Sequence, residues 1–170
     1  MSLLRITKFG EPVLVGAARP VTDLGPDTQK LINDMFDTMY AASGIGLAAP
    51  QVNVSLRLAV INVTPETRRG QFVIINPKIV KREGSLASEE GCLSLPGAGG
   101  ATFHRAAKVM VEAVNEKGLP VVISGEGLLA RCLQHEIDHL DGKMIIHHAS
   151  FKRRMEMRWA IRKMKKDGLW

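Results

Sequence analysis

The chain has 170 residues, of which 45% are hydrophobic and 24% charged, and its formal net charge is +6. These values are ordinary for a soluble globular protein and predict a single domain, residues 1–170, with a substantial core. No apolar run approaches the roughly 20 residues of a membrane-spanning helix, and no signal-peptide pattern is present. With only Cys92 and Cys132, we expect a reducing compartment and no disulfide framework.

Apolar spacing and turn residues predict a helix over residues 26–42, with Asp23 or Asp27 as its cap. Strands, a hairpin and two further helices are expected to follow. In chain order these are strands 57–63 and 71–76, hairpin strands 108–114 and 119–123, and helices 125–140 and 150–166. Strands grouped together with helices at the ends indicate an α+β fold.

The sharpest motif is HEIDH at residues 135–139, inside a predicted helix. Residues four apart lie on one face of a helix, so His135 and His139 can reach one metal ion. Glu136 between them can then handle the proton of a water molecule at that ion. A chance match on a polar helix surface is the alternative.

A catalytic zinc-type site needs a third protein ligand. Cys132 lies seven residues before His139, or about 10.5 Å along a helix, which is too far for a short thiol to share the ion. It is better explained as a small buried side chain that lines the pocket. Cys92 lies outside any helical pattern and could approach from the opposite side, although a structural cysteine is equally compatible with the sequence.

The segment GIGLAAPQ at residues 44–51 follows the first predicted helix. Its glycines permit close backbone approach by a ligand, and Gln51 could point a hydrogen-bond donor into a pocket. The simpler interpretation, a helix end followed by a tight turn, is favoured by this segment alone.

Together these segments resemble the peptide deformylase family, whose motifs GIGLAAxQ, EGCLS and QHExDH stand at residues 44–51, 90–94 and 134–139. The resemblance implies antiparallel β-strands around a central helix that carries HExxH, with a C-terminal helix. It implies metal-dependent removal of the formyl group from the formyl-methionine of nascent peptides. A bacterial enzyme and a processed organellar one are both compatible with the sequence, but the absence of a transit segment favours the bacterial cytoplasm. One divalent ion is implied, ferrous iron, with zinc, nickel or cobalt able to substitute.

The resemblance also implies a role for each motif residue. These are metal ligands Cys92, His135 and His139; acid/base Glu136; oxyanion donors Gln51 and the Leu93 N–H; a substrate contact at Gly46; methionine-pocket residues Ile45, Leu128 and Cys132; and a buried ion pair, Glu90 with Arg105. The glycine-rich loop 97–104 is one residue longer than the family pattern, which argues slightly against this ion pair. Arg131 replaces an often apolar residue. It could edge the pocket and favour an acidic residue farther along the substrate, or it could simply face solvent, and we expect the latter.

The positive charge is concentrated in the last predicted helix. Residues 152–167 contain eight basic and two acidic side chains, and subtracting these from the chain's 23 and 17 leaves 15 of each sign elsewhere. Such asymmetry favours an anionic partner, although a solvated helix face is equally compatible with it. The resemblance implies docking to the ribosome through this helix.

Two other functions share the HEIDH motif. A zinc peptidase would give Cys92 no role and would cleave internal peptide bonds. A ribosome- or RNA-binding module would hold a structural metal with four protein ligands, but we find no fourth ligand, because His147 and His148 lie beyond the helix and are expected at the surface.

Overall fold

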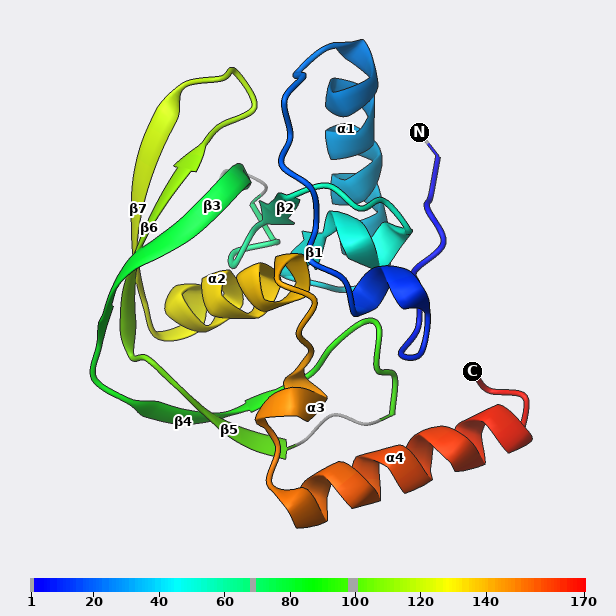
Figure 1. Ribbon diagram of the computed structural model, residues 1–170. Helices are drawn as coiled ribbons and strands as arrows, with labels where there is room; N and C mark the ends of the chain where they lie inside the picture. Colours follow the sequence, from blue (N-terminus) through cyan, green and yellow to red (C-terminus); the bar gives the residue numbers. More distant parts are fainter. Residues whose placement is uncertain (1, 68–69, 98–100) are drawn as a thin grey trace.

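The computed structural model describes residues 2–67, 70–97 and 101–170, and its fold is α+β as the sequence predicts. Helix α2 lies at the centre, and the strands curve around it (Figure 1). The helices are α1 Pro26–Ala41, α2 Gly127–Leu140, α3 Ile145–His148 and α4 Phe151–Lys166, with 3₁₀ turns η1 Pro12–Leu14 and η2 Ala49–Val52. The strands are β1 Gly46–Ala48, β2 Leu58–Ile61, β3 Phe72–Glu83, β4 Leu86–Glu90, β5 Ala101–Arg105, β6 Lys108–Val114 and β7 Pro120–Glu126.

All strand pairs are antiparallel. One sheet has five strands in the order β1-β2-β3-β6-β7, and β4 pairs with β5 in a second sheet. The long strand β3 has a register shift between Ile75 and Lys78, where Asn76 has a φ of 50°. Pro77 stands at the same point and has no amide hydrogen to donate, so regular pairing with β6 is interrupted there.

The five-stranded sheet is covered on both faces, which explains why β2 is buried at all four positions. Successive strand side chains point to opposite faces. Ala59 and Ile61 belong to a core cluster with α2, whereas Leu58 and Val60 belong to a second cluster with α1. Burial on both faces fixes α2 against β1 and β2, and this contact determines where its histidines point.

A third core cluster joins the C-terminal helix to the segment that follows β4. Met157 and Ile161 of α4 pack with Leu95 and Phe103. The exposed side of α4 carries Phe151 and basic residues. Helix α4 therefore supports the segment that contains Cys92.

The structure confirms the predicted helices and strands and corrects several of their ends. The cap prediction is wrong: Gly25 is the N-cap of α1, no side chain caps it, and Pro26 occupies the first turn. The helix predicted from residue 125 begins two residues later, because β7 continues to Glu126. The predicted strand 71–76 continues to Glu83. Part of the loop 97–104 is strand β5, and its residues 98–100 lie outside the described part.

Candidate metal centre

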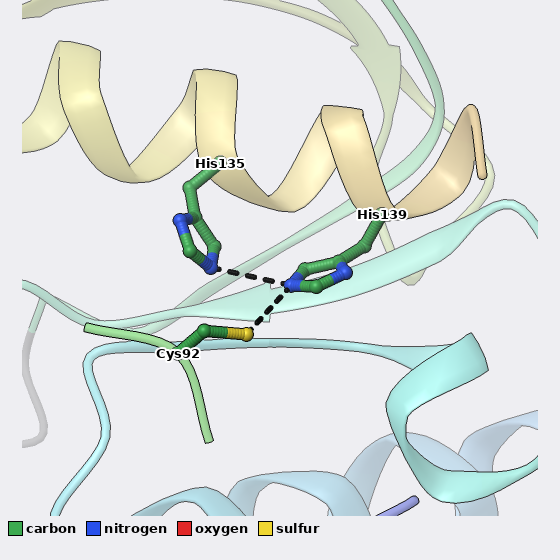
Figure 2. Close-up of side chains that lie close together, drawn as sticks. All are labelled: Cys92, His135 and His139. Carbon is green, nitrogen blue, oxygen red and sulfur yellow. Dashed lines mark hydrogen bonds between the residues drawn. The ribbon is translucent and has the colours of Figure 1, made fainter. Parts of the chain in front are cut away.

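Three side chains from two distant parts of the chain converge beside α2 (Figure 2). His135 and His139 are on consecutive turns of α2, and Cys92 follows β4. The Nε2 atom of His139 lies 3.2 Å from Nε2 of His135 and 3.2 Å from Sγ of Cys92. Both histidines are buried.

The chemistry and spacing of this cluster suit one metal ion. One ligand atom from each residue lies within 4.8 Å of the others. Ligands about 2.0–2.3 Å from a tetrahedral ion stand about 3.3–3.8 Å apart, close to the two measured separations. Among the described residues this is the only cluster of its kind. Three ligands leave a fourth position open, as in catalytic rather than structural sites.

Electrostatics favour the thiolate form of Cys92, which is the form that binds metals. Burial raises the pKa of this thiol, but the charge of His139 and hydrogen bonds from His135 and His139 outweigh that effect and lower the pKa to about 5. Burial lowers the pKa of His135, but hydrogen bonds with Cys92 and Glu90 outweigh burial and raise it to about 10.

A buried ion pair holds His135 in place. The Nδ1 atom of His135 lies 3.1 Å from Oε2 of Glu90, and this oxygen accepts a 3.0 Å hydrogen bond from Nη2 of Arg105. Burial raises the pKa of Glu90, but hydrogen bonds from His135 and Arg105 outweigh it and lower the pKa to about 2. The pair is therefore present despite the longer loop, and it fixes which ring nitrogen of His135 faces the cluster.

Two residues to which the sequence analysis gave no role in the site, Asp138 and His148, extend this network to the surface. Arg105 also donates to Oδ2 of Asp138 at 2.8 Å, and Nε2 of His148 lies 2.8 Å from the same oxygen. His148 is exposed as predicted. The position of Asp138 in HEIDH, three residues after His135, could have indicated that it belongs to this network. Nothing in the sequence indicated that His148 does.

Glu136 stands beside the cluster with part of its carboxylate unused. The residue is 3% exposed, and its Oε2 atom has no partner in the described part of the chain. Burial raises the pKa of this carboxyl. A buried carboxylate oxygen without a partner is costly, and at a reactive site it is available to a substrate or a water molecule.

Gln51 is held with its amide nitrogen toward the same place. Its Oε1 atom accepts a 2.8 Å hydrogen bond from the Ala48 N–H, and Nε2 lies 3.8 Å from Sγ of Cys92. Nε2 also donates to Oγ of Ser94 at 3.3 Å. Ser94 was quoted in the EGCLS motif without a role, and the structure shows that it helps to orient Gln51.

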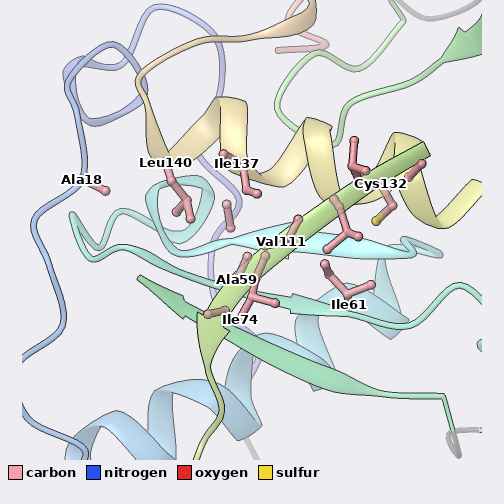
Figure 3. Packing of buried hydrophobic residues seen from close by; sticks show 13 residues of the cluster. Ala18, Ala59, Ile61, Ile74, Val111, Cys132, Ile137 and Leu140 are labelled. Atoms are coloured by element: carbon pink, nitrogen blue, oxygen red, sulfur yellow. The ribbon is translucent and has the colours of Figure 1, made fainter. Parts of the chain in front are cut away.

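A pocket of about 310 Å³ opens onto the cluster. It brings together most of the predicted site residues, namely Ile45, Gly46, Gln51, Glu90, Cys92, Leu93, Cys132, His135 and Glu136. Leu128 is not among the lining residues and is 41% exposed. Cys132 lies at the end of the core cluster beneath α2 (Figure 3), and burial raises its pKa well above the ordinary value. It therefore remains a thiol and lines the pocket, as the helix geometry predicts.

Arg131 does not simply face solvent, so that expectation is wrong. It is half-buried and lines the pocket. Its Nη1 atom donates a 2.9 Å hydrogen bond to the backbone oxygen of Glu89 in β4. This bond holds the side chain at the pocket rather than free in solvent.

Comparisons with known proteins agree with one another. The family described as Polypeptide deformylase matches residues 3–155. The peptide deformylase of Desulfitobacterium hafniense is 50% identical over 88% of this chain and 96% of its own length. That of Acidobacterium capsulatum is 46% identical over 100% of both chains. The crystal structure of a peptide deformylase from Legionella pneumophila has a TM-score of 0.92 and 48% identity over 97% of this chain and 96% of its own.

Proposed function

The chain belongs to the polypeptide deformylase family, and we propose that its pocket removes the formyl group from the N-terminal formyl-methionine of newly made polypeptides, releasing formate. This makes the protein a metal-dependent hydrolase that acts on a linear amide. The observation that carries the proposal is the convergence of Cys92, His135 and His139 beside the partnerless carboxylate oxygen of Glu136. A peptidase that used only the two histidines would not need the thiolate.

Cys92, His135 and His139 would hold the ion. One thiolate and two imidazoles can bind ferrous iron, zinc, nickel or cobalt, and the geometry of the site and the supply of each metal decide which ion is bound. We propose ferrous iron, with the other three able to replace it. When bound, the ion supplies a Lewis acid that polarises the formyl oxygen and makes water a stronger nucleophile.

Glu136 would carry the proton through the reaction. Its free carboxylate oxygen accepts a proton from the attacking water, whose oxygen forms a bond to the formyl carbon. As the bond from that carbon to nitrogen breaks, Glu136 returns the proton to the leaving amine. Burial, which raises the pKa of Glu136, favours this exchange because the carboxyl is then a stronger base.

Gln51 and Leu93 would stabilise the charge that develops on the formyl oxygen. Hydrogen bonds with Ala48 and Ser94 orient the side-chain amide of Gln51. The amide therefore loses little conformational entropy when Nε2 donates to the formyl oxygen. The N–H of Leu93 follows the cysteine ligand directly. In other acyl-transfer sites, one such donor contributes about 2.7–4 kcal/mol to the transition state.

The methionine side chain would enter beside Ile45 and Cys132, which line the pocket. Leu128 is exposed at the start of α2, so we assign it to the rim, where a longer substrate side chain would reach it. Gly46 would contact the substrate through its backbone, because it belongs to the edge strand β1 and lines the pocket.

Alanine at Gly46 is expected to lower kcat by about 10²-fold, the usual cost of moving a reacting group by about 1 Å. A Cβ atom there would contact Oε1 of Glu136 and stand 2.8 Å from Sγ of Cys132, so the carboxylate would have to move. The measurement is the initial rate of formate release. The matched control is Gly16→Ala, a position outside the pocket whose Cβ would meet nothing within 4 Å; equal losses in both variants would contradict this account.

The proposed function is tested by formate release from formyl-Met-Ala-Ser. We expect turnover by the metal-loaded protein, loss of turnover to the detection limit after chelation, and recovery when ferrous iron is added without oxygen. Recovery with zinc, nickel and cobalt in parallel would rank the ions. A metal-loaded protein that cleaves internal peptide bonds but releases no formate would refute the proposal.

We also propose that α4 docks on the ribosome, from whose surface nascent chains emerge. Arg158, Arg162 and Lys166 follow one another at four-residue spacing and are exposed, so they form a basic stripe that suits RNA phosphates. A different side of α4 is occupied by Met157 and Ile161 in the core. One side of α4 therefore packs on the body of the protein, and the basic stripe remains exposed for a partner.

Changing Arg158, Arg162 and Lys166 together to glutamine is expected to abolish co-sedimentation with ribosomes at low salt and to reduce the salt dependence of binding. Substitution is preferable to deletion, since removing α4 would uncover Leu95 and Phe103. The control changes three exposed cations outside α4, namely Lys78, Arg82 and Lys117. Unchanged binding by the α4 variant would rule out docking through this stripe.

We propose that residues 1–170 form one catalytic domain that works in the bacterial cytoplasm, with the basic helix at residues 150–166 as part of it. Within the described residues, no helix is long and apolar enough to cross a membrane. Packing of α4 against the segment after β4 supports a single unit rather than a separate tail.

A further inference from the structure

Arg131 lines the catalytic pocket but has no part in the reaction proposed above. It stands four residues before His135 on α2, so the two side chains lie on the same face of the helix, one turn apart. His135 and Cys132 are buried, whereas Arg131 is only half-buried. Arg131 therefore borders the opening of the pocket rather than its floor.

The guanidinium group of Arg131 keeps most of its hydrogen-bonding capacity. One of its five N–H donors is used by the Glu89 backbone oxygen. In β4, alternate side chains point to opposite faces, and Glu90 points inward to Arg105. No carboxylate of the described residues forms an ion pair with Arg131. The backbone bond thus positions a cation without neutralising it.

Arg131 is also the only arginine or lysine among the described residues that line this pocket. The carboxylate of Glu90, which lines it too, is already paired with Arg105. A substrate side chain that reaches the rim would therefore meet a single unpaired positive charge.

The geometry of an extended peptide indicates which substrate residue meets that charge. Side chains of alternate residues in an extended chain point to the same side, about 6.6–7 Å apart. If the first residue places its methionine beside Cys132 of α2, the third residue also points toward α2. Arg131 is adjacent to Cys132 in the chain and stands at the rim, where that third side chain would leave the pocket.

We propose that Arg131 is a specificity-determining residue that favours nascent peptides with an acidic side chain at the third position. The inference rests on the proposed function, because it needs formyl-methionine to be anchored in the pocket. Arg131 lies away from the bond that breaks, so the ion pair would be equally strong in the bound substrate and in the transition state. Such uniform binding changes KM and leaves kcat nearly constant.

The test compares formyl-Met-Ala-Glu, formyl-Met-Ala-Gln and formyl-Met-Ala-Lys, all amidated at the C-terminus so that no terminal carboxylate competes. For the metal-loaded wild type we expect kcat/KM to be about three- to tenfold higher with glutamate than with lysine, the range of a partly exposed ion pair. The difference should appear in KM and shrink as salt is added.

Two variants assign the preference to the side chain. In Arg131→Gln the glutamate-to-lysine ratio should fall to about one, and in Arg131→Glu it should invert. The matched control is Arg82→Gln, an exposed arginine of β3 outside the pocket, which should keep the wild-type ratio. Formyl-Met-Glu-Ala and formyl-Met-Lys-Ala amides place the charges at the second position, where no preference is expected.

The outcomes separate this inference from the function on which it rests. Formate release without a glutamate preference, or a preference that survives in Arg131→Gln, would overturn the role of Arg131 and leave the deformylase activity intact. A preference at the second position alone would overturn the placement of the third residue. Absence of formate from every peptide would overturn both proposals.

Discussion

Replacing Glu136 by glutamine is expected to lower kcat for formate release by about 10²–10⁴-fold, the usual contribution of a general acid/base. Glutamine keeps the volume and one oxygen of the side chain but cannot accept the proton of the attacking water. The three side chains that we propose as metal ligands are untouched, so the variant should retain its ion. Kinetics on formyl-Met-Ala-Ser and the metal content of the same samples provide the measurement.

The matched control for this variant is Glu112→Gln, which makes the same chemical change on the exposed side of β6. It should retain wild-type kcat, because Glu112 is remote from the pocket. If the Glu136 variant kept full kcat with its metal bound, another group would have to carry the proton. If it lost its metal, Glu136 would instead be needed to hold the site together.

The central helix and its two histidines could be predicted because the pattern that specifies them lies within a few consecutive residues of the sequence. Four-residue spacing on a helix determines which side chains share a face, so the HEIDH motif was enough to bring His135 and His139 together and to exclude Cys132. The approach of Cys92 could not be derived in this way. It depends on β4, β5 and α4, whose contacts join residues far apart in the sequence.

The strands that the sequence analysis missed have little hydrophobic pattern. Most side chains of β4 are exposed, and its buried position is the charged Glu90. Strand β1 is three residues long and includes a glycine, so it resembles a turn. Strands β1 and β4 both flank the pocket. The elements with the weakest hydrophobic pattern in the sequence are therefore the ones that complete the site.

For Arg131, too, the sequence alone could not predict where the side chain lies. Its place in the sequence does not distinguish the solvent face of α2 from the pocket rim, because the two are separated by only part of a helical turn. The hydrogen bond to Glu89 decides between them, and it joins residues that are 42 positions apart in the chain.

Replacing Arg105 by methionine is expected to lower the free energy of unfolding by about 3–5 kcal/mol, the usual cost of breaking a buried ion pair from one side. The side chains of Arg105 and Glu90 are 7% and 2% exposed, so the variant would leave a buried carboxylate with one partner, His135. Typical domains have only about 5–15 kcal/mol of stability. Urea unfolding at pH 7 measures the loss. A second expected effect is weaker metal binding, by about 10–100-fold, because Glu90 would no longer be held against His135.

The pH dependence distinguishes this explanation from a simple loss of packing. Together with the hydrogen bond from His135, the ion pair lowers the pKa of Glu90 to about 2, against about 4.3 in an unfolded chain. Its stabilisation is therefore complete above about pH 4.3 and is lost as the pH falls toward 2. The stability gap between wild type and variant should narrow over that interval, whereas a packing defect would persist. Arg5→Met, which breaks the exposed pair with Glu11, should cost far less stability at pH 7, because solvent screens an exposed ion pair; an equal loss in both variants would show that burial of Glu90 is not the cause.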